Sequence, residues 1–105
     1  MIKATLYYNE NGDVYRFYVR YHGDAVVCAG VSALVITCVN FIQAKFQLDA
    51  NLHLEDMEYI DFEINEIKNG QTIESAGLII ENMVFGLRLI EEAYGDDIRI
   101  EEIRK

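Results

Sequence analysis

The chain has 105 residues, the length of one domain, and we treat residues 1–105 as a single domain. Its composition, 51% hydrophobic and 26% charged, excludes intrinsic disorder. The formal net charge of -9 repels phosphate, so we expect neither direct nucleic-acid binding nor binding to an anionic membrane. The same charge would attract a basic peptide or protein segment.

The N-terminal residues alternate in the manner of a strand and do not form a secretory signal. Polar residues interrupt the longest apolar stretches before they reach the roughly 18 residues of a membrane span, so we expect no such span. Cys28 and Cys38 would lie about 15 Å apart along one helix, beyond the reach of a disulfide. We therefore expect two free thiols and a reducing, cytoplasmic location.

Two strands are predicted at the start of the chain. Residues 2–8 and 14–21 each alternate between apolar and polar side chains. Between them, Asn11 and Gly12 supply the positive φ angles that a tight hairpin turn needs. The sequence therefore predicts an antiparallel hairpin.

Residues 25–47 are mostly apolar over a length too great for a strand, which predicts a buried helix. Its polar residues fall on one narrow stripe that begins at Cys28 and continues through Ser32. The rest of the circumference, including Cys38 and Phe41, is predicted to pack against other elements.

The second half of the chain predicts two strands, a helix and a last strand. Residues 52–54 are a weak strand signal and residues 59–67 a clearer one. From Thr72, a suitable N-cap, apolar residues recur every three or four positions as far as Tyr94, which predicts a helix. Residues 98–101 alternate again. The order is β-β-α-β-β-α-β, and the predicted fold class is α+β, a mostly antiparallel sheet packed with two helices.

The junction between the second strand and the first helix brings a histidine and a cysteine together in the sequence. His22 ends the strand, and Cys28 lies at the start of the helix. Free N–H groups and the positive end of the helix dipole favour thiolate over thiol, and a neighbouring imidazole is the usual activator of a cysteine nucleophile. Ser32, one turn later, would hydrogen-bond the thiolate or a substrate group. Backbone N–H groups near Ala29 and Gly30 would hold an oxyanion.

The other reactive residue types are better explained by structure than by chemistry. His53 is predicted to be an exposed polar position and Cys38 a plain core residue. The histidines and cysteines do not fall at metal-ligand spacing, so we expect no metal site. Gly23 and Gly30 match no nucleotide-binding fingerprint, and we expect no cofactor.

The segment that begins at His22 resembles a family signature. In the ribosomal-processing cysteine protease family (Prp), a Gly-His-Ala motif and a loop precede Asp-Ile-Val-Cys-Ala-x-Val-Ser, and this chain has Val-Val-Cys-Ala-Gly-Val-Ser at residues 26–32. Residues 83–99 and the order of elements are also similar to that family. The chain looks like a short-loop variant, because only five residues separate His22 from Cys28.

The resemblance implies a function and a site. Members of the family are small cytoplasmic homodimers with a Cys–His dyad, and they remove a hydrophobic and basic N-terminal extension from large-subunit ribosomal protein L twenty-seven before assembly. By residue match, Cys28 would be the nucleophile, His22 the general base and Ser32 the family's serine. Asp24 would stand in for the aspartate of the motif. The implied partner is a ribosomal protein precursor.

Two other interpretations stay open at this point. One is a non-catalytic, dimeric, acidic binding module of the same fold, which would bind a basic ribosomal or assembly partner while Cys28 only packs. The other is a thiol redox sensor, which is weakened because Cys38 lies on a different face of the helix and cannot act as a resolving cysteine. Exposed tyrosines such as Tyr7 and Tyr18 favour a homodimer in either case.

Overall fold

The computed structural model describes all 105 residues and contains five strands and three helices. Their bounds are β1 Ile2–Tyr8, β2 Val14–Arg20, α1 Ala25–Lys45, β3 Ala50–Glu55, β4 Tyr59–Ile64, α2 Asn65–Lys68, α3 Glu74–Ala93 and β5 Ile98–Arg104. Apart from the single-turn helix α2, this is the predicted order of elements.

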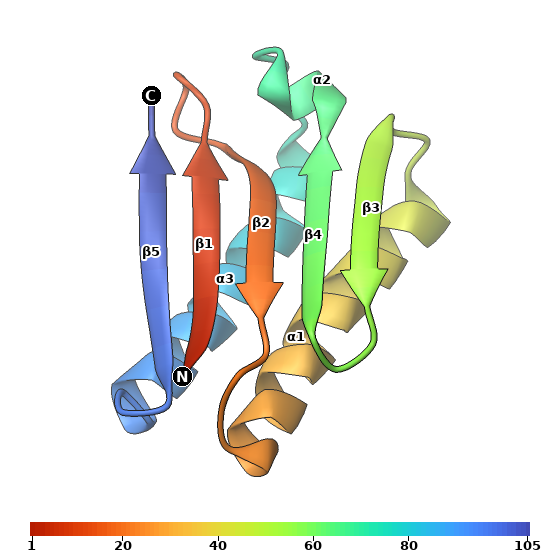
Figure 1. Cartoon of the computed structure of the whole chain (residues 1–105). Coiled ribbons are helices and arrows are strands. Elements are labelled where there is room, and N and C mark those ends of the chain that lie inside the picture. Colours follow the sequence, from red (N-terminus) through yellow and green to blue (C-terminus); the bar gives the residue numbers. More distant parts are fainter.

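The strands form one sheet in the order β3-β4-β2-β1-β5. Three neighbouring pairs are antiparallel, and only β1 and β5 run parallel. Strand β5 runs parallel to β1 because helix α3 carries the chain back to the end of the sheet at which β1 begins, so both strands start from that end. Figure 1 shows α1 and α3 together behind the sheet, covering one of its faces. The predicted α+β class, a mostly antiparallel sheet packed with two long helices, is confirmed.

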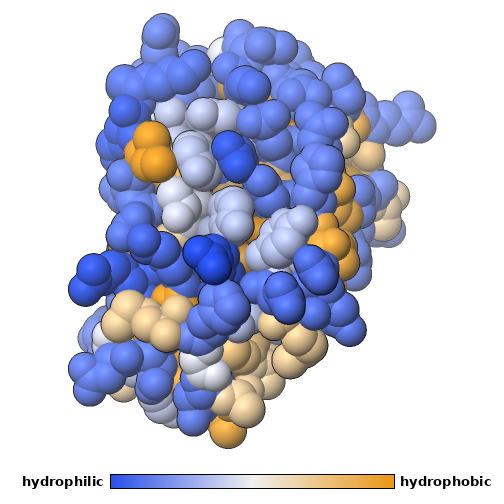
Figure 2. Space-filling model, in the orientation of Figure 1, coloured by the Kyte–Doolittle hydropathy of each residue, from blue (hydrophilic) through white to orange (hydrophobic).

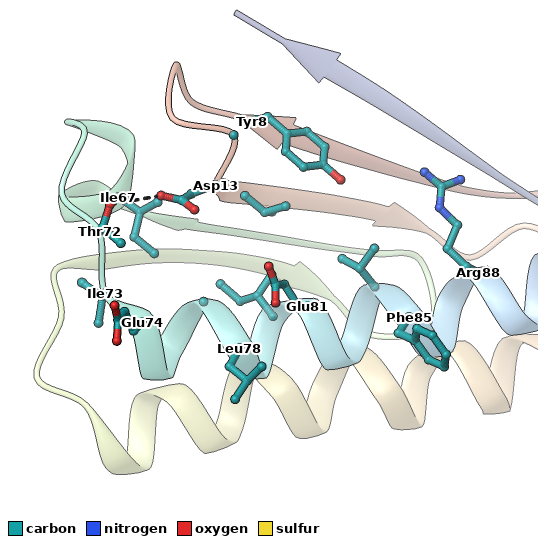
Figure 3. A pocket seen from close by; sticks show the side chains of 15 residues that line it. Tyr8, Asp13, Ile67, Thr72, Ile73, Glu74, Leu78, Glu81, Phe85 and Arg88 are labelled. Atoms are coloured by element: carbon teal, nitrogen blue, oxygen red, sulfur yellow. Dashed lines mark hydrogen bonds between the residues drawn. The ribbon is translucent and has the colours of Figure 1, made fainter.

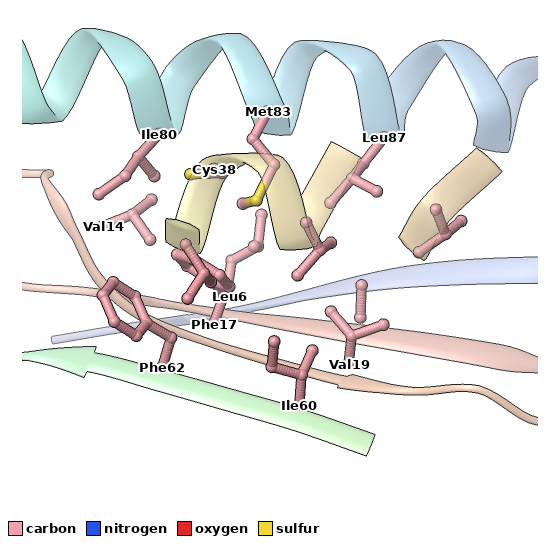
Figure 4. Packing of buried hydrophobic residues seen from close by; sticks show 14 of the residues in the cluster. Leu6, Val14, Phe17, Val19, Cys38, Ile60, Phe62, Ile80, Met83 and Leu87 are labelled. Carbon is pink, nitrogen blue, oxygen red and sulfur yellow. The ribbon is translucent and has the colours of Figure 1, made fainter. Parts of the chain in front are cut away.

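The core lies between the sheet and the two long helices. Alternate strand residues point toward the helices, as the period of two in a strand requires. Figure 4 shows these side chains meeting those of the helices, and the labelled residues are Leu6, Val14, Phe17, Val19, Ile60, Phe62, Cys38, Ile80, Met83 and Leu87. Phe17 and Phe62 are neighbours on adjacent strands, and their ring centroids are 5.6 Å apart.

Helix α1 packs as a core helix. Its length of 21 residues and its mean hydropathy of 2.3 would suffice for a membrane span, so the polar interruptions noted in the sequence do not by themselves exclude one. A helix in the core of a globular protein can have the same length and hydropathy. Helix α1 presents a buried stripe to the sheet, which consists of Val27, Cys28, Val31, Val35, Cys38, Val39 and Ile42. The prediction that most of the circumference is packed is wrong, because Val26, Ile36 and Phe41 are 76%, 43% and 44% exposed. The predicted polar stripe is also wrong at its first member, since Cys28 lies on the buried stripe.

The other face of the sheet carries no helix. It is mostly hydrophilic, as Figure 2 shows in the orientation of Figure 1. Arg16 donates two hydrogen bonds to the carboxylate of Asp61, at 2.8 and 2.7 Å, and this pairing raises the pKa of Arg16 above its ordinary value. Tyr18 and Tyr59 stack with ring centroids 5.9 Å apart. This face is held together by side-chain pairs between neighbouring strands.

Two local predictions need correction. Residues 65–67 were expected to continue a strand, but Asn65–Lys68 form helix α2, in which Ile67 is buried. Thr72 does not cap the second long helix. That helix begins at Glu74, and the Thr72 hydroxyl instead donates to the Asp13 carboxylate of the first hairpin at 3.4 Å.

Two glycines of α3 provide a stability test of the helix–helix contact. A Cβ added at Gly86 would come within 2.8 Å of the Leu34 side chain on α1, whereas one added at Gly77 meets nothing within 4 Å. We expect Gly77→Ala to stabilise the protein by about 0.5–1 kcal/mol through helix propensity, and Gly86→Ala to lose that gain because Leu34 must shift. Urea unfolding of both variants measures the difference, and equal gains would contradict the close approach.

Candidate active site

The connection from β2 to α1 is short and fixed at several points. Tyr21 donates its backbone N–H to the Glu58 carbonyl at 2.8 Å. A Cβ added at Gly23 would lie 3.0 Å from Cγ1 of Ile2, so the backbone of this loop runs close against β1. The backbone on both sides of His22 is therefore held in place, and mainly its side chain can move.

Asp24 begins helix α1. Its Oδ1 accepts hydrogen bonds from the N–H groups of Val26 and Val27 at 2.9 and 3.1 Å, which makes it a side-chain N-cap. The carboxylate predicted from the motif to belong to the site is thus used to set where the helix starts. Its place in the sequence fixes the first turn and, with it, the position of Cys28.

Cys28 lies at the end of the first turn of α1 and is 7% exposed. Its thiol donates toward the carbonyl oxygen of Gly23, with 3.7 Å between sulfur and oxygen. The sulfur therefore lies at the helix N-terminus, as predicted, beneath the loop that carries His22. Its backbone N–H donates to the Asp24 carbonyl at 2.8 Å, the first regular bond of the helix.

Cys28 lines a pocket of about 400 Å³. One wall is the exposed side of α1, and the other is the turn between β3 and β4. The apolar members of this lining are Tyr21, Ala25, Cys28, Ala29, Ala33, Ile36, Leu54, Met57, Tyr59 and Ile60. Glu55 and Asp56 place two carboxylates on the turn that forms the outer wall. The pocket is an apolar cavity with an acidic edge, suited to an apolar side chain beside a basic one.

The polar groups beside the sulfur come from Tyr21 and Ser32. The Tyr21 hydroxyl is buried and has no hydrogen-bond partner of good geometry. Burial raises the pKa of Tyr21 above its ordinary value; the Ser32 side chain opposes the rise and Cys28 adds to it. Tyr21 therefore keeps its proton at neutral pH and presents an O–H donor without an acceptor next to Cys28.

His22 is exposed, and no hydrogen bond joins its ring to Cys28. Its Nε2 lies 3.4 Å from a guanidinium nitrogen of Arg20 instead. The ring is turned toward the end of β2, and His22 is not among the residues that line the Cys28 pocket.

Ala29 and Gly30 lie in the second turn of α1. In a regular helix their N–H groups are used by carbonyls one turn earlier, so the interior of the helix does not offer them to an oxyanion. Ala25 is the first residue of the helix, and its N–H has no acceptor in the structure. Ala25 also lines the pocket.

The outer wall of the pocket was not predicted from the sequence. Leu54 and Met57, 56% and 72% exposed, reach it from the β3–β4 turn. Met57 has a φ of 63°, the left-handed region that a methionine seldom adopts. The one usable signal was a single apolar residue, Met57, within the acidic segment 55–58, where an exposed turn would ordinarily be polar throughout.

Cys38 differs from Cys28 in ways that alkylation can detect. It is 4% exposed in the core, and burial raises the pKa of its thiol to about 12. At pH 8 its thiolate fraction is then about one in ten thousand, so we expect Cys38 to resist iodoacetamide in the folded protein and to react once urea unfolds it. Mass spectrometry of Cys28→Ala isolates this thiol, and rapid labelling under native conditions would contradict its placement.

Comparisons with known proteins place the chain in a family. The model of the family described as cysteine protease Prp matches residues 1–99. The ribosomal processing cysteine protease Prp of Bacillus subtilis (strain 168) is 36% identical over 80 residues, which cover 75% of this chain and 71% of that protein. The match includes most of both chains.

Solved structures agree with this placement. A crystal structure of the essential ribosomal processing protease Prp from S. aureus, in complex with a covalently linked product peptide, matches with a TM-score of 0.85 and 27% identity over 98% of this chain and 100% of that one. A second structure, with a substrate peptide, has the same TM-score of 0.85, 25% identity and the same coverage, 98% and 100%. This chain therefore belongs to the cysteine protease Prp family, a family of ribosomal processing proteases.

Proposed function

We propose that this protein is a cytoplasmic endopeptidase that removes the N-terminal extension of large-subunit ribosomal protein L twenty-seven, with Cys28 as nucleophile and His22 as general base. The observation that carries the proposal is the place of Cys28, at the end of the first turn of α1 and on the wall of an apolar pocket. Membership of the protease family supports the same reaction.

The reaction proceeds in two steps. The His22 imidazole takes the proton of the Cys28 thiol, and the thiolate attacks the carbonyl carbon of the scissile peptide bond. The imidazolium then gives that proton to the departing amine, which leaves an acyl group on the sulfur. In the second step His22 takes a proton from water, and the resulting hydroxide attacks the thioester carbonyl carbon. The C–S bond breaks, the extension is released with a free carboxylate, and the imidazolium returns its proton to the Cys28 sulfur.

The oxyanion needs donors other than those predicted from the sequence. We assign the Ala25 N–H and the Tyr21 hydroxyl, because both lack an acceptor and both residues line the pocket beside Cys28. Backbone and hydroxyl donors of this kind stabilise charge as it develops on the carbonyl oxygen. The Ser32 side chain on α1 lowers the pKa of Tyr21, against the effect of burial.

Loss of the Tyr21 hydroxyl tests this assignment. We expect Tyr21→Phe to lower kcat about 10- to 100-fold, with little change in KM, because a single oxyanion donor acts in the transition state. Tyr59→Phe is the matched control, since Tyr59 lines the same pocket and stacks on Tyr18. Equal activity of the two variants would remove Tyr21 from the mechanism.

Substrate binding has to turn the His22 ring away from Arg20. The loop backbone is fixed by the contacts of Tyr21 and Gly23, so the movement is a side-chain rotation rather than a rebuilding of the loop. Catalytic hydrogen bonds are often loose before substrate binds. A peptide that occupies the pocket would exclude water from the sulfur and complete the dyad.

The proposed substrate suits the charge of the enzyme. The extension is hydrophobic and basic, while the pocket is apolar with Glu55 and Asp56 at its edge and the whole chain carries a charge of -9. Apolar side chains would enter the pocket and basic ones would lie near the carboxylates. Electrostatic attraction of this kind raises the rate of encounter.

A cleavage assay with the purified protein tests the proposal. We expect it to convert the ribosomal precursor to its mature form by one cut, and to leave the mature protein intact. The B. subtilis relative serves as the positive control for the precursor. Cleavage by the relative but not by this protein would contradict the proposed function.

A non-catalytic binding module of the same fold is the second candidate. It is favoured by one observation, namely that the Cys28 thiol and the His22 ring each have another partner, Gly23 and Arg20. Such a module would bind the precursor without cutting it. Binding of the intact precursor with no product after prolonged incubation would select this candidate.

The assembly proposed for either function is a homodimer. The outward faces of α1 and α3 carry exposed apolar side chains, which include Ile36, Phe41 and Leu89. A monomeric mass by light scattering at micromolar concentration would contradict this assembly.

A further inference from the structure

A second cavity, larger than the Cys28 pocket, lies at the opposite end of the sheet. It is a groove of about 620 Å³ between α3, the β1–β2 hairpin and the segment that follows α2. None of its lining residues belongs to the Cys28 pocket. Its floor is apolar and is formed by Val14, Ile67, Ile80 and Val84.

Two large apolar side chains of the groove are left in solvent. Leu78 and Phe85 line it from α3, and each is 67% exposed. They are seven residues apart, so they lie on the same face of the helix, two turns from each other. Exposed apolar groups beside a groove mark an interaction site more often than scattered ones do.

The polar groups at the groove are acidic and largely free. Asp13, Glu74 and Glu81 line it, and none of the three takes part in an ion pair. Figure 3 shows Glu81 directed from α3 toward the hairpin, and Asp13 near Thr72, which is its hydrogen-bond donor. The groove therefore has unbalanced negative charge around an apolar floor.

The only cation in the lining is already neutralised. Arg88 pairs with Glu91 at 3.2 Å and with Glu102 at 2.7 Å. It closes the end of the groove near Tyr8, whose hydroxyl also donates to Glu102 at 3.2 Å. Burial and this carboxylate raise the pKa of Tyr8, so the hydroxyl stays neutral and adds no charge to the groove.

We propose that this groove is a second docking site for the ribosomal protein substrate, which binds a basic amphipathic segment of it outside the cleaved peptide bond. The inference rests on the proposed function for the identity of the partner. Lysine and arginine side chains would pair with Asp13, Glu74 and Glu81, while apolar side chains pack on Leu78 and Phe85. A second copy of this chain, with a charge of -9, fits less well because it brings acidic surface to an acidic groove.

A docking site of this kind leaves a kinetic signature. It adds binding energy for the whole precursor, which lowers KM, and it contributes nothing to a short peptide that spans only the cleaved bond. The two substrates therefore separate the groove from the catalytic site. Higher salt should weaken binding of the precursor, because the carboxylates are exposed to solvent.

The first experiment removes charge from the groove. We expect the double variant Glu74→Gln/Glu81→Gln to raise KM for the precursor about tenfold, with kcat/KM for the short peptide unchanged. The control is Glu92→Gln/Asp96→Asn, which makes the same change in net charge at exposed positions outside the groove. Equal KM values for the two double variants would overturn the proposal.

The second experiment measures binding without catalysis. In the Cys28→Ala background, fluorescence anisotropy follows labelled ribosomal protein that lacks the extension. We expect Phe85→Ala to weaken binding at least about tenfold, whereas Tyr94→Ala, an exposed aromatic residue at the end of the same helix and outside the groove, does not. Unchanged affinity in Phe85→Ala would contradict docking here.

These outcomes separate the two proposals. If the wild-type protein cuts neither precursor nor peptide, the proposed function fails, while the binding measurement still decides on the groove. If the groove variants dissociate a dimer without changing affinity for the ribosomal protein, the groove belongs to a second copy and the docking proposal is wrong.

Discussion

Cys28→Ala is expected to abolish cleavage of the ribosomal precursor, with a loss of about a thousandfold or more in kcat. The reason is that no other thiol reaches the pocket, and alanine has no atom that can form the acyl intermediate. The variant should still fold, because removing one buried sulfur atom lowers the free energy of unfolding by only about 1 kcal/mol. Product formation followed by mass spectrometry, with circular dichroism to verify folding, measures both effects.

Cys38→Ala is the matched control for this variant. Cys38 lies on the same helix but faces the core between sheet and α3, away from the pocket that contains Cys28. We expect full activity in Cys38→Ala after correction for any loss of folded protein. Activity that persists in Cys28→Ala and is lost in folded Cys38→Ala would reverse the assignment of the nucleophile.

His22→Gln is expected to lower kcat about 100- to 10,000-fold while the protein still binds its substrate. Glutamine retains a polar side chain of similar reach but cannot accept and return a proton in the reaction. The residue is exposed, so stability should change by less than about 0.5 kcal/mol. Cleavage kinetics of the folded variant, measured beside the wild-type protein, test this expectation.

His53→Gln serves as the control for His22. His53 lies on β3 at the open face of the sheet, opposite Asp61, and its loss should leave cleavage unchanged. Arg20→Gln adds a second check, because freeing Nε2 from the guanidinium should preserve or raise activity if the ring must turn toward Cys28. Wild-type rates in His22→Gln would exclude the histidine and leave Cys28 to act with another base.

Much of the fold follows from local patterns in the sequence. The alternation in residues 2–8 and the turn residues that follow predict the first hairpin, because both are local features of the sequence. Of the predicted Asn11–Gly12 pair, only Gly12 has a positive φ, 84°. The parallel pairing of β5 with β1 does not follow from alternation, since it joins segments at opposite ends of the chain. Helix α2 was missed because a single turn is too short to show a helical period.

The residues of the candidate site also divide into those that local sequence features predict and those that depend on contacts between distant parts of the chain. The helix start at residue 25, and with it the place of Cys28 in the first turn, was predicted because the start of a helix is a local feature, whereas the capping role of Asp24 was not predicted. The wall made by Leu54 and Met57 was missed because periodicity does not tell which hairpin will lie beside a helix. The direction of the His22 ring depends on Arg20, an interaction between side chains that the spacing of residues does not specify.

Trapping the acyl acceptor tests the central claim most directly. The protein is incubated with a peptide that copies the residues before the cut and ends in a chloromethyl ketone, and the adduct is located by peptide mapping. We predict one adduct per chain, on the sulfur of Cys28, and slower labelling in His22→Gln. A protein that cleaves the precursor yet carries the adduct on Cys38, or forms none on Cys28, would contradict the account.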